Sequence, residues 1–363
     1  MTPLSCTRRE QAQIDFVGEL MMFNSLVVGR AMSQDFARRF PEEQSPPPTI
    51  EQIALEMDNC PSYRLGAFFE YHNHGKLFRR LLAAIERQSD EIRAWLDAVN
   101  KPGALGSVEL DQNLSPPSYY RKLEIHTQPG NYHGEFAGIL YHTMIGPFLV
   151  HRDDHDEMGW TLARGVPTRP YHRIVDLGCG IGKSTLPYCD QFPQAEIIGI
   201  DYSAAMLKYA HHLSEARGRR VTYLQRYAES TGLAENSADL VTAIWLFHEM
   251  PRSARAATVR EALRILRPGG YFAIMESPPF KELCENYGPL SAFLLDSTGR
   301  RMCDPFIPEF FSCDRVGMLA SEGFSEVRDV ALPNELTGWG SGNSYFFGAY
   351  PWWMTIGKKA DRP

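Results

Sequence analysis

The sequence predicts an α/β fold with a doubly wound, mostly parallel sheet, and three observations support that prediction. From residue 172 onward, short apolar runs alternate with amphipathic stretches, as in parallel strands joined by crossover helices. The apolar run at 172–177 leads into a glycine-rich turn and then into a helix-forming stretch at 183–189. This is the strand, turn and helix that open a Rossmann-like sheet. Near the N-terminus, by contrast, the apolar residues recur at helical spacing.

Residues 1–118 are predicted to form a helical region outside the sheet. Helical spacing of apolar residues through 10–40 indicates one or two helices. Three prolines at 46–48 then break the chain. Thr49 is predicted to cap the next helix, with Gln52 as its reciprocal partner.

The rest of the chain is expected to divide into a lid and a sheet domain. Residues 63–99 continue as helix, and prolines at 116–117 introduce a segment of different character. We expect residues 119–168 to connect the two parts and to form a lid over the site. Residues 169–363 are expected to form the sheet domain, interrupted by a long insertion at 278–312. Connections of this length are usually lids or substrate loops.

Seven strands are expected in this Rossmann-like sheet, five before the insertion and two after it. The corresponding apolar runs lie near 172–177, 196–200, 220–225, 239–246, 270–276, 325–331 and 349–357. A helix at 253–266 fits between the fourth and fifth runs, where parallel strands require a crossover connection.

The glycine-rich turn carries the first functional signal. It reads VDLGCGIGKS, whereas a phosphate-binding P-loop needs G-x-x-x-x-G-K-[ST]. Counting back from Gly182, the required first glycine falls on Leu177, so the loop is too short and Lys183 is expected to be solvated. A dinucleotide-binding fingerprint needs the spacing G-x-G-x-x-G. The three glycines of this turn, Gly178, Gly180 and Gly182, have the spacing G-x-G-x-G instead, so this fingerprint also fails.

Two carboxylates further limit the class of ligand that can bind beside this turn. Asp176 ends the first strand, where it would repel a pyrophosphate and attract a cationic group. Asp201 ends the second strand, where an acidic side chain can accept hydrogen bonds from ribose hydroxyls. A ligand with a ribose, a cationic amino-acid end and no phosphate satisfies both positions. S-adenosylmethionine is such a ligand.

This part of the chain resembles the class I S-adenosylmethionine-dependent methyltransferases, and in particular those that act on small molecules. The matching segments are VDLGCGIG at 175–182, GIDYS at 199–203, Met206 in the following helix and LRPGGYFAIME at 266–276. The resemblance covers about residues 170–280. The motifs are specific in combination and weak singly.

The resemblance also implies roles for individual residues. The cofactor-binding set that it implies is Asp176, Gly178, Gly180, Gly182, Asp201, Tyr202, Met206, Ala228 and Glu229. The glycines would let the backbone approach the methionine part, Asp201 would hold the ribose, and Tyr202 and Met206 would flank the adenine. After the third strand the family often has an acidic residue before an alanine, but this chain has Tyr227 before Ala228. Adenine recognition is therefore expected at the Ala228 backbone.

Four residues are candidates for the chemistry: His248, Glu249, Tyr132 and His133. His248 and Glu249 follow the fourth strand, at the edge of the sheet where ligands bind. A neutral imidazole there would serve as a general base. The alternative is that His248 only orients the cofactor or caps a loop. Glu276, at the end of the fifth strand, is a further crevice residue with the same two interpretations.

Tyrosine and histidine concentrate between residues 119 and 155. We expect residues 128–142 to fold over the cofactor pocket, with Tyr132 and His133 lining the substrate cavity, because such side chains supply apolar walls with polar tips. The alternative is that they belong to the core of the helical region.

Two further segments were weighed as functional. His151 and His155 have the i, i+4 spacing of a metal-ligand pair, but Arg152 between them favours a solvated turn, so no metal is expected. The glycine-rich, aromatic stretch at 337–347 is interpreted either as a loop that closes over the substrate or as an ordinary surface turn.

Composition argues against several classes of protein. The net charge of −7 argues against nucleic acid as partner, because binding a polyanion depends on clustered Lys and Arg. No run of eighteen apolar residues is present, so no membrane-spanning helix is expected. Charged residues interrupt the apolar stretch near the N-terminus, and no signal peptide is expected. Seven cysteines without a C-x-x-C pair indicate reduced thiols in a cytoplasm.

These features together predict a cytoplasmic methyltransferase that uses S-adenosylmethionine and acts on a small-molecule metabolite by in-line methyl transfer. It would bind neither nucleic acid nor membrane, and a homodimer would form through the helical N-terminal region. Two alternatives stay open. One is a protein or peptide methyltransferase, and the other is a protein that binds S-adenosylmethionine without transferring its methyl, as in a cyclisation or in regulation.

Overall fold

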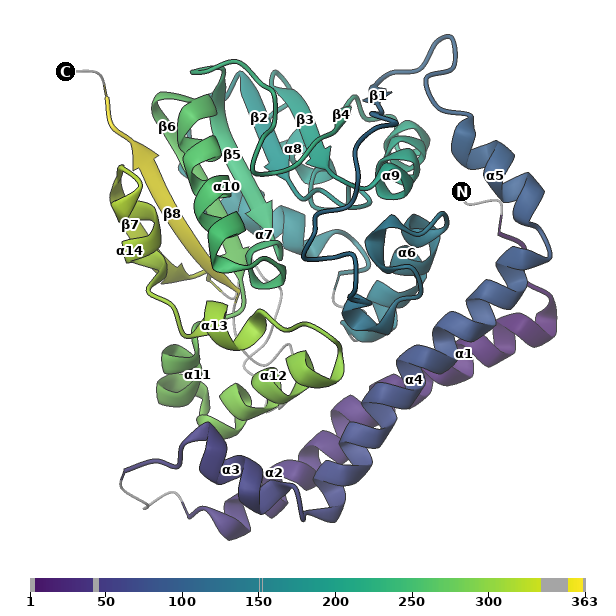
Figure 1. Cartoon of the computed structure of the whole chain (residues 1–363), viewed down its shortest axis with the longest axis vertical. Coiled ribbons are helices and arrows are strands. Elements are labelled where there is room, and N and C mark those ends of the chain that lie inside the picture. Colours follow the sequence, from purple (N-terminus) through teal and green to yellow (C-terminus); the bar gives the residue numbers. More distant parts are fainter. Residues whose placement is uncertain (1–3, 42–45, 150, 152, 334–351, 362–363) are drawn as a thin grey trace.

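One sheet organises the molecule. A computed structural model describes residues 4–41, 46–149, 151, 153–333 and 352–361. Within these residues eight strands form a sheet in the order β1-β4-β3-β2-β5-β6-β8-β7 (Figure 1). The strands are β1 (Ser107–Glu109), β2 (Arg173–Leu177), β3 (Glu196–Asp201), β4 (Thr222–Gln225), β5 (Ala238–Ile244), β6 (Leu266–Glu276), β7 (Phe324–Ala331) and β8 (Trp353–Lys359). The first six are parallel, and β8 is antiparallel to both of its neighbours. The predicted α/β fold is confirmed.

Side chains alternate between the two faces of the sheet, and each face has its own apolar core. Ile174 and Ile197 pack in one core with residues of α6 (Ala137–Phe148), α7 (Glu157–Gly165), α8 (Leu186–Gln191) and α9 (Ala204–Ala216). Their chain neighbours Val175 and Ile198 pack in the other core with residues of α10 (Arg252–Ile265) and α14 (Arg315–Ser321). Helices on both faces explain why every residue of β5 is buried.

The sheet differs from the prediction at two places. β1 adds an eighth strand, so the expectation that the first 118 residues lie outside the sheet is wrong at 107–109. A strand of three residues is too short to show an alternating pattern in the sequence. In the structure the Asn100 side chain holds this strand by hydrogen bonds to the backbone N–H and C=O of Val108. The last strand was expected at 349–357 and is found as β8; residues 349–351 lie outside the described residues.

The N-terminal region is helical, as expected. α1 (Arg8–Phe23) continues through a π-helical segment, Asn24–Val28, into α2 (Gly29–Arg39). α3 (Ile50–Met57), α4 (Pro61–Glu86) and α5 (Ser89–Asp97) follow. The capping box of Thr49 and Gln52 at the start of α3 is confirmed. α1 and α4 lie side by side at the edge of the molecule, away from the sheet (Figure 1).

The insertion is joined to these N-terminal helices. It forms α11 (Phe280–Tyr287), α12 (Pro289–Arg301) and α13 (Ile307–Phe311). Glu70 of α4 is buried and accepts hydrogen bonds from Thr298 (2.8 Å) and Arg301 (2.7 Å) of α12. α1 and α4 also contact α6. The N-terminal helices therefore connect the insertion with the segment that precedes β2, while the domain boundaries at 118 and 168 stay predictions.

Several large apolar side chains of the N-terminal helices face solvent. The exposed ones are Phe16, Phe23, Leu26 and Val27 on α1 and the π-helical segment, and Leu65, Phe68 and Tyr71 on α4. Among the helices of the described residues, none has both the length and the apolar character needed to cross a bilayer.

Candidate cofactor cavity and active site

The turn after β2 takes a backbone course that favours glycine. Gly178, Gly180 and Gly182 have φ values of 67°, 50° and 82°, in the left-handed region that other residues rarely adopt. A Cβ added to Gly182 would lie 2.6 Å from the hydroxyl oxygen of Tyr223. The turn is closed by backbone hydrogen bonds from Cys179 to the Ile200 carbonyl and from Gly182 to the Cys179 carbonyl. It therefore brings the ends of β2 and β3 together.

Asp176 holds the residues around this turn in place through hydrogen bonds. This corrects the expectation that the Asp176 side chain faces the ligand. Its carboxylate is fully buried and accepts hydrogen bonds from Ser184 (2.9 Å), Thr185 (2.7 Å) and Thr242 (2.9 Å). Burial raises the pKa of Asp176, and these three hydroxyls lower it. Its carboxylate is directed at these protein hydroxyls, and Asp176 is not among the residues that line the cavity.

Asp201 is the carboxylate that does line the cavity. Its Oδ2 accepts the backbone N–H of Gly180 at 3.0 Å and its Oδ1 accepts that of Ser203 at 2.8 Å. Burial and, to a smaller extent, the nearby Glu249 raise the pKa of Asp201, these two N–H groups lower it, and the net pKa is about 6. Each oxygen holds one N–H donor, and a carboxylate accepts about four hydrogen bonds. Asp201 therefore keeps acceptor capacity for ligand hydroxyls.

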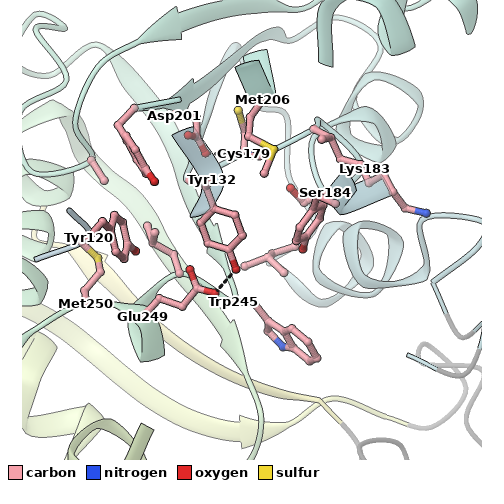
Figure 2. A pocket seen from close by; sticks show the side chains of 18 of the residues that line it. Tyr120, Tyr132, Cys179, Lys183, Ser184, Asp201, Met206, Trp245, Glu249 and Met250 are labelled. Atoms are coloured by element: carbon pink, nitrogen blue, oxygen red, sulfur yellow. Dashed lines mark hydrogen bonds between the residues drawn. The ribbon is translucent and has the colours of Figure 1, made fainter. Parts of the chain in front are cut away.

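A cavity of about 110 Å³ lies at the carboxyl ends of β2, β3 and β5 (Figure 2). Seven of the residues predicted to bind the cofactor line it, namely Gly178, Gly180, Asp201, Tyr202, Met206, Ala228 and Glu229. Gly182 does not, because it lies behind the turn, against Tyr223. Seven of the nine predicted residues thus share one cavity, and their roles toward a cofactor stay predictions; Asp176 and Gly182 shape the cavity without lining it.

Tyrosines from the segment before β2 form the opposite wall. Tyr119, Tyr120, Tyr132 and Tyr141 all line the cavity. The Tyr120 ring lies 5.3 Å from that of Tyr202, centroid to centroid. The Tyr132 hydroxyl donates a hydrogen bond of 2.7 Å to Glu249, and Figure 2 shows both side chains directed into the cavity. The expectation that 128–142 folds over the pocket agrees with this placement.

His133 does not reach the cavity, which corrects its selection as a candidate. It follows Tyr132 in the 3-10 turn Asn131–His133, where successive side chains point about 120° apart. Tyr132 is buried and His133 is exposed. Of the two, only Tyr132 lines the cavity.

Lys183 is not solvated, contrary to expectation. It is buried and its Nζ lies 3.5 Å from Asp153 and 3.3 Å from Asp156, two residues of the segment before β2. Its charge is thus already paired. The cavity lining also contains Asp153, Asp201, Glu229 and Glu249, so its electrostatic field favours a cation and opposes a phosphate group.

Two other segments were weighed as functional from the sequence. His151 forms an exposed pair with Asp154 at 3.0 Å. Arg152 and residues 337–347 lie outside the described residues.

His248 lies behind the cavity, in an acidic surrounding that the sequence did not reveal. Its Nδ1 is 2.7 Å from Glu276 Oε2 and its Nε2 is 3.5 Å from Asp304 Oδ2. Burial lowers the pKa of the imidazole, but the carboxylates of Glu276 and Asp304 raise it by more, to about 10. A base must be neutral to accept a proton, so this acidic surrounding opposes the interpretation of His248 as a general base, which stays a prediction. Glu276 is an acceptor for His248 and for the Phe247 backbone N–H.

Comparisons with known proteins match the part of the chain that forms the sheet. Residues 174–270 match a family model described as a methyltransferase domain. A ubiquinone/menaquinone biosynthesis C-methyltransferase from Syntrophotalea carbinolica is 32% identical over 183 residues, which cover 47% of this chain and 76% of that protein. A demethylmenaquinone methyltransferase from Thermus thermophilus is 34% identical over 107 residues, which cover 30% of this chain and 48% of that protein. A trans-aconitate 2-methyltransferase from an Azoarcus species is 32% identical over 152 residues, which cover 40% of this chain and 57% of that protein.

The chain therefore belongs to the class I S-adenosylmethionine-dependent methyltransferase family. It spans about half the length of the last two of these relatives. The cavity fits the family's cofactor on three grounds. Asp201 has acceptor capacity for ribose hydroxyls, the lining is acidic toward a sulfonium and an ammonium group, and the buried Tyr202 hydroxyl has no hydrogen-bond partner among the described residues.

Proposed function

We propose that the protein transfers a methyl group from S-adenosylmethionine to a small-molecule acceptor. The observation that carries the proposal is a cavity of about 110 Å³ at the carboxyl ends of β2, β3 and β5, which has Asp201 on one wall and four tyrosines on the other. A concave site lined by aromatic side chains and a few polar groups is typical of small-molecule binding.

The residues of the cavity have separate tasks in this proposal. When bound, the cofactor supplies an activated methyl group on a positively charged sulfur. Asp201 accepts the ribose hydroxyls, the Ala228 backbone and the Tyr202 ring hold the adenine, and the acidic lining offsets the positive charge. Tyr120 and Tyr132 exclude water, so that the acceptor meets the methyl group in a fixed orientation.

The acceptor is proposed to enter from the second cavity, on the far side of Trp245. That cavity, of about 20 Å³, is lined by Phe148 of α6, by Trp245 after β5 and by residues of the insertion, among them Leu295 and Met302. Trp245 also lines the first cavity, so the two are adjacent. The relatives named above act on a demethylmenaquinone and on trans-aconitate. We extend to this chain only their common feature, an oxygen-bearing metabolite with an unsaturated carbon frame.

Three further parts of the proposal concern the surroundings of the enzyme. The protein is proposed to act in the cytoplasm, which the seven free cysteines support. The net charge of −7 supports the absence of a nucleic-acid partner. A homodimer is proposed to form through the exposed apolar side chains of α1 and α4, because such surfaces commonly mark interfaces.

An acceptor screen tests the proposed activity. The purified chain is incubated with S-adenosylmethionine that carries a trideuterated methyl group and with a small-molecule extract, and products are identified by mass spectrometry. A compound that gains the trideuterated methyl group only when active protein is present supports the proposal. If peptides gain the label and metabolites do not, the acceptor class is wrong.

A further inference from the structure

A second group of functional side chains lies behind the cofactor cavity. We call it the histidine–carboxylate cluster; its members are His126, His248, Glu249, Glu276 and Asp304. They come from the turn Ile125–Thr127, the turn after β5, the end of β6 and the loop after α12. The proposed binding of the cofactor uses only one of them, Glu249, as part of the acidic lining.

The cluster contains three buried carboxyl groups, and one of them has no hydrogen-bond partner among the described residues. Glu249, Glu276 and Asp304 have side-chain exposures of 9%, 1% and 1%. Neither carboxylate oxygen of Asp304 accepts a hydrogen bond from the described residues. Its ion-pair partner His248, at 3.5 Å, is already bonded to Glu276. A buried carboxylate without hydrogen bonds is costly, and a metal ion that bound its oxygens would remove that cost.

The spacing of the cluster suits a metal ion. One ligand atom each from His126, Glu249 and Asp304 can be chosen so that all lie within 4.8 Å of one another. Nε2 of His126 is 3.5 Å from Oε1 of Glu249. Ligands about 2.1 Å from a tetrahedral metal are about 3.4 Å apart, so this pair already has the separation of two ligands on one ion.

The backbone at His126 is held in an unusual conformation that presents the imidazole to the cluster. His126 and Thr127 have φ values of 55° and 56°, which β-branched residues in particular avoid. The His126 N–H donates to the Met302 carbonyl at 2.7 Å, which ties this turn to the loop that carries Asp304. Strain of this kind persists where the surrounding structure over-determines it, often at ligand sites.

We propose that His126, Glu249 and Asp304 bind one divalent transition-metal ion. Tyr132 supports Glu249 through its hydroxyl, as outer hydrogen bonds commonly do for metal-binding carboxylates. One imidazole and two carboxylates suit Mn²⁺, Fe²⁺ or Zn²⁺ better than Mg²⁺ or Ca²⁺, which prefer oxygen ligands alone. Three protein ligands leave coordination positions open.

The position of the ion between the two cavities indicates which part of the acceptor it would bind. Glu249 lines the cofactor cavity, whereas His126 and Asp304 line the second cavity. An ion held by all three would lie between donor and acceptor and would bind an acceptor through carboxylate or enolate oxygens. This last step rests on the proposed function, while the metal site does not.

Metal binding to the untagged full chain tests the proposal directly. The protein is stripped with a chelator and titrated calorimetrically with MnCl₂ and, separately, with ZnSO₄. We expect about one ion per chain for the wild type and at least tenfold weaker binding for Asp304→Asn and for His126→Asn, in which asparagine tolerates the positive φ. Two controls should bind as the wild type does: Asp296→Asn, a buried α12 aspartate paired with Arg300, and His151→Gln, from the exposed His151–Asp154 pair.

The outcomes separate the metal site from the proposed function. Binding of S-adenosylhomocysteine is measured on the same samples, and it also reports whether each variant is folded. No metal binding by the wild type, or equal binding by the wild type and both cluster variants, overturns the site, whatever the result with S-adenosylhomocysteine. Loss of metal binding in His151→Gln alone assigns the ion to the surface pair and overturns the proposal as well.

Discussion

The carboxylate of Asp201 should control cofactor affinity, and its effect can be worked out from its contacts. It holds one backbone N–H on each oxygen, at 3.0 Å and 2.8 Å, and in the proposal it also accepts the ribose hydroxyls. Charge-assisted hydrogen bonds contribute about 1.5–3 kcal/mol, so Asp201→Asn should weaken binding of S-adenosylhomocysteine about 10- to 150-fold. Calorimetry measures this, with Asp190→Asn, an exposed aspartate paired with Arg219, as the control.

The same residue predicts a pH dependence of defined sign. Burial raises the pKa of Asp201 to about 6, above its ordinary value, and ribose hydroxyls donate to the ionised form. Affinity should therefore be full above about pH 7 and fall as the pH drops through 6, to about one tenth at pH 5. Asp201→Asn should lose this dependence. Equal affinities of wild type and variant, or a wild-type affinity that does not change between pH 7.5 and 5, would refute the placement of the ribose.

Three other predictions concern the framework and assembly. Gly182→Ala should lower the free energy of unfolding by about 2 kcal/mol or more in urea, because φ is 82° and the new Cβ would meet the Tyr223 hydroxyl; an unchanged midpoint contradicts this. Glu70→Ala should cost about 3 kcal/mol in the same assay, since it leaves the largely buried Arg301 without its carboxylate, and a loss under 1 kcal/mol would show that the link is not structural. Phe68→Glu should convert the proposed dimer into a monomer of 41.1 kDa by light scattering; a wild type that is already monomeric excludes the dimer.

Local signals allowed much of the cavity to be predicted from the sequence. The glycines at 178, 180 and 182 and the acidic end of β3 lie within one strand-turn-helix unit and its successor, so their spacing alone places them at one edge of the sheet. Tyr132 was selected because tyrosines concentrate in its segment, and it does line the cavity. β1 could not be predicted, because three residues carry no periodicity.

Sequence reasoning was weakest where distant segments determine a side chain's surroundings. The charge of His248 depends on Glu276 and Asp304, which lie 28 and 56 residues further along the chain. Lys183 is buried because Asp153 and Asp156 approach from the segment before β2. His133 differs from Tyr132 only by its position in a single turn. The histidine–carboxylate cluster combines four segments, and no short motif could have indicated it.

The position of bound S-adenosylhomocysteine in a crystal structure tests the central claim most directly. We expect its density in the cavity at the carboxyl ends of β2, β3 and β5, with the ribose hydroxyls on Asp201 and the adenine between Tyr202 and the Ala228 backbone. Density at another site, or a ribose that does not contact Asp201, would contradict the account.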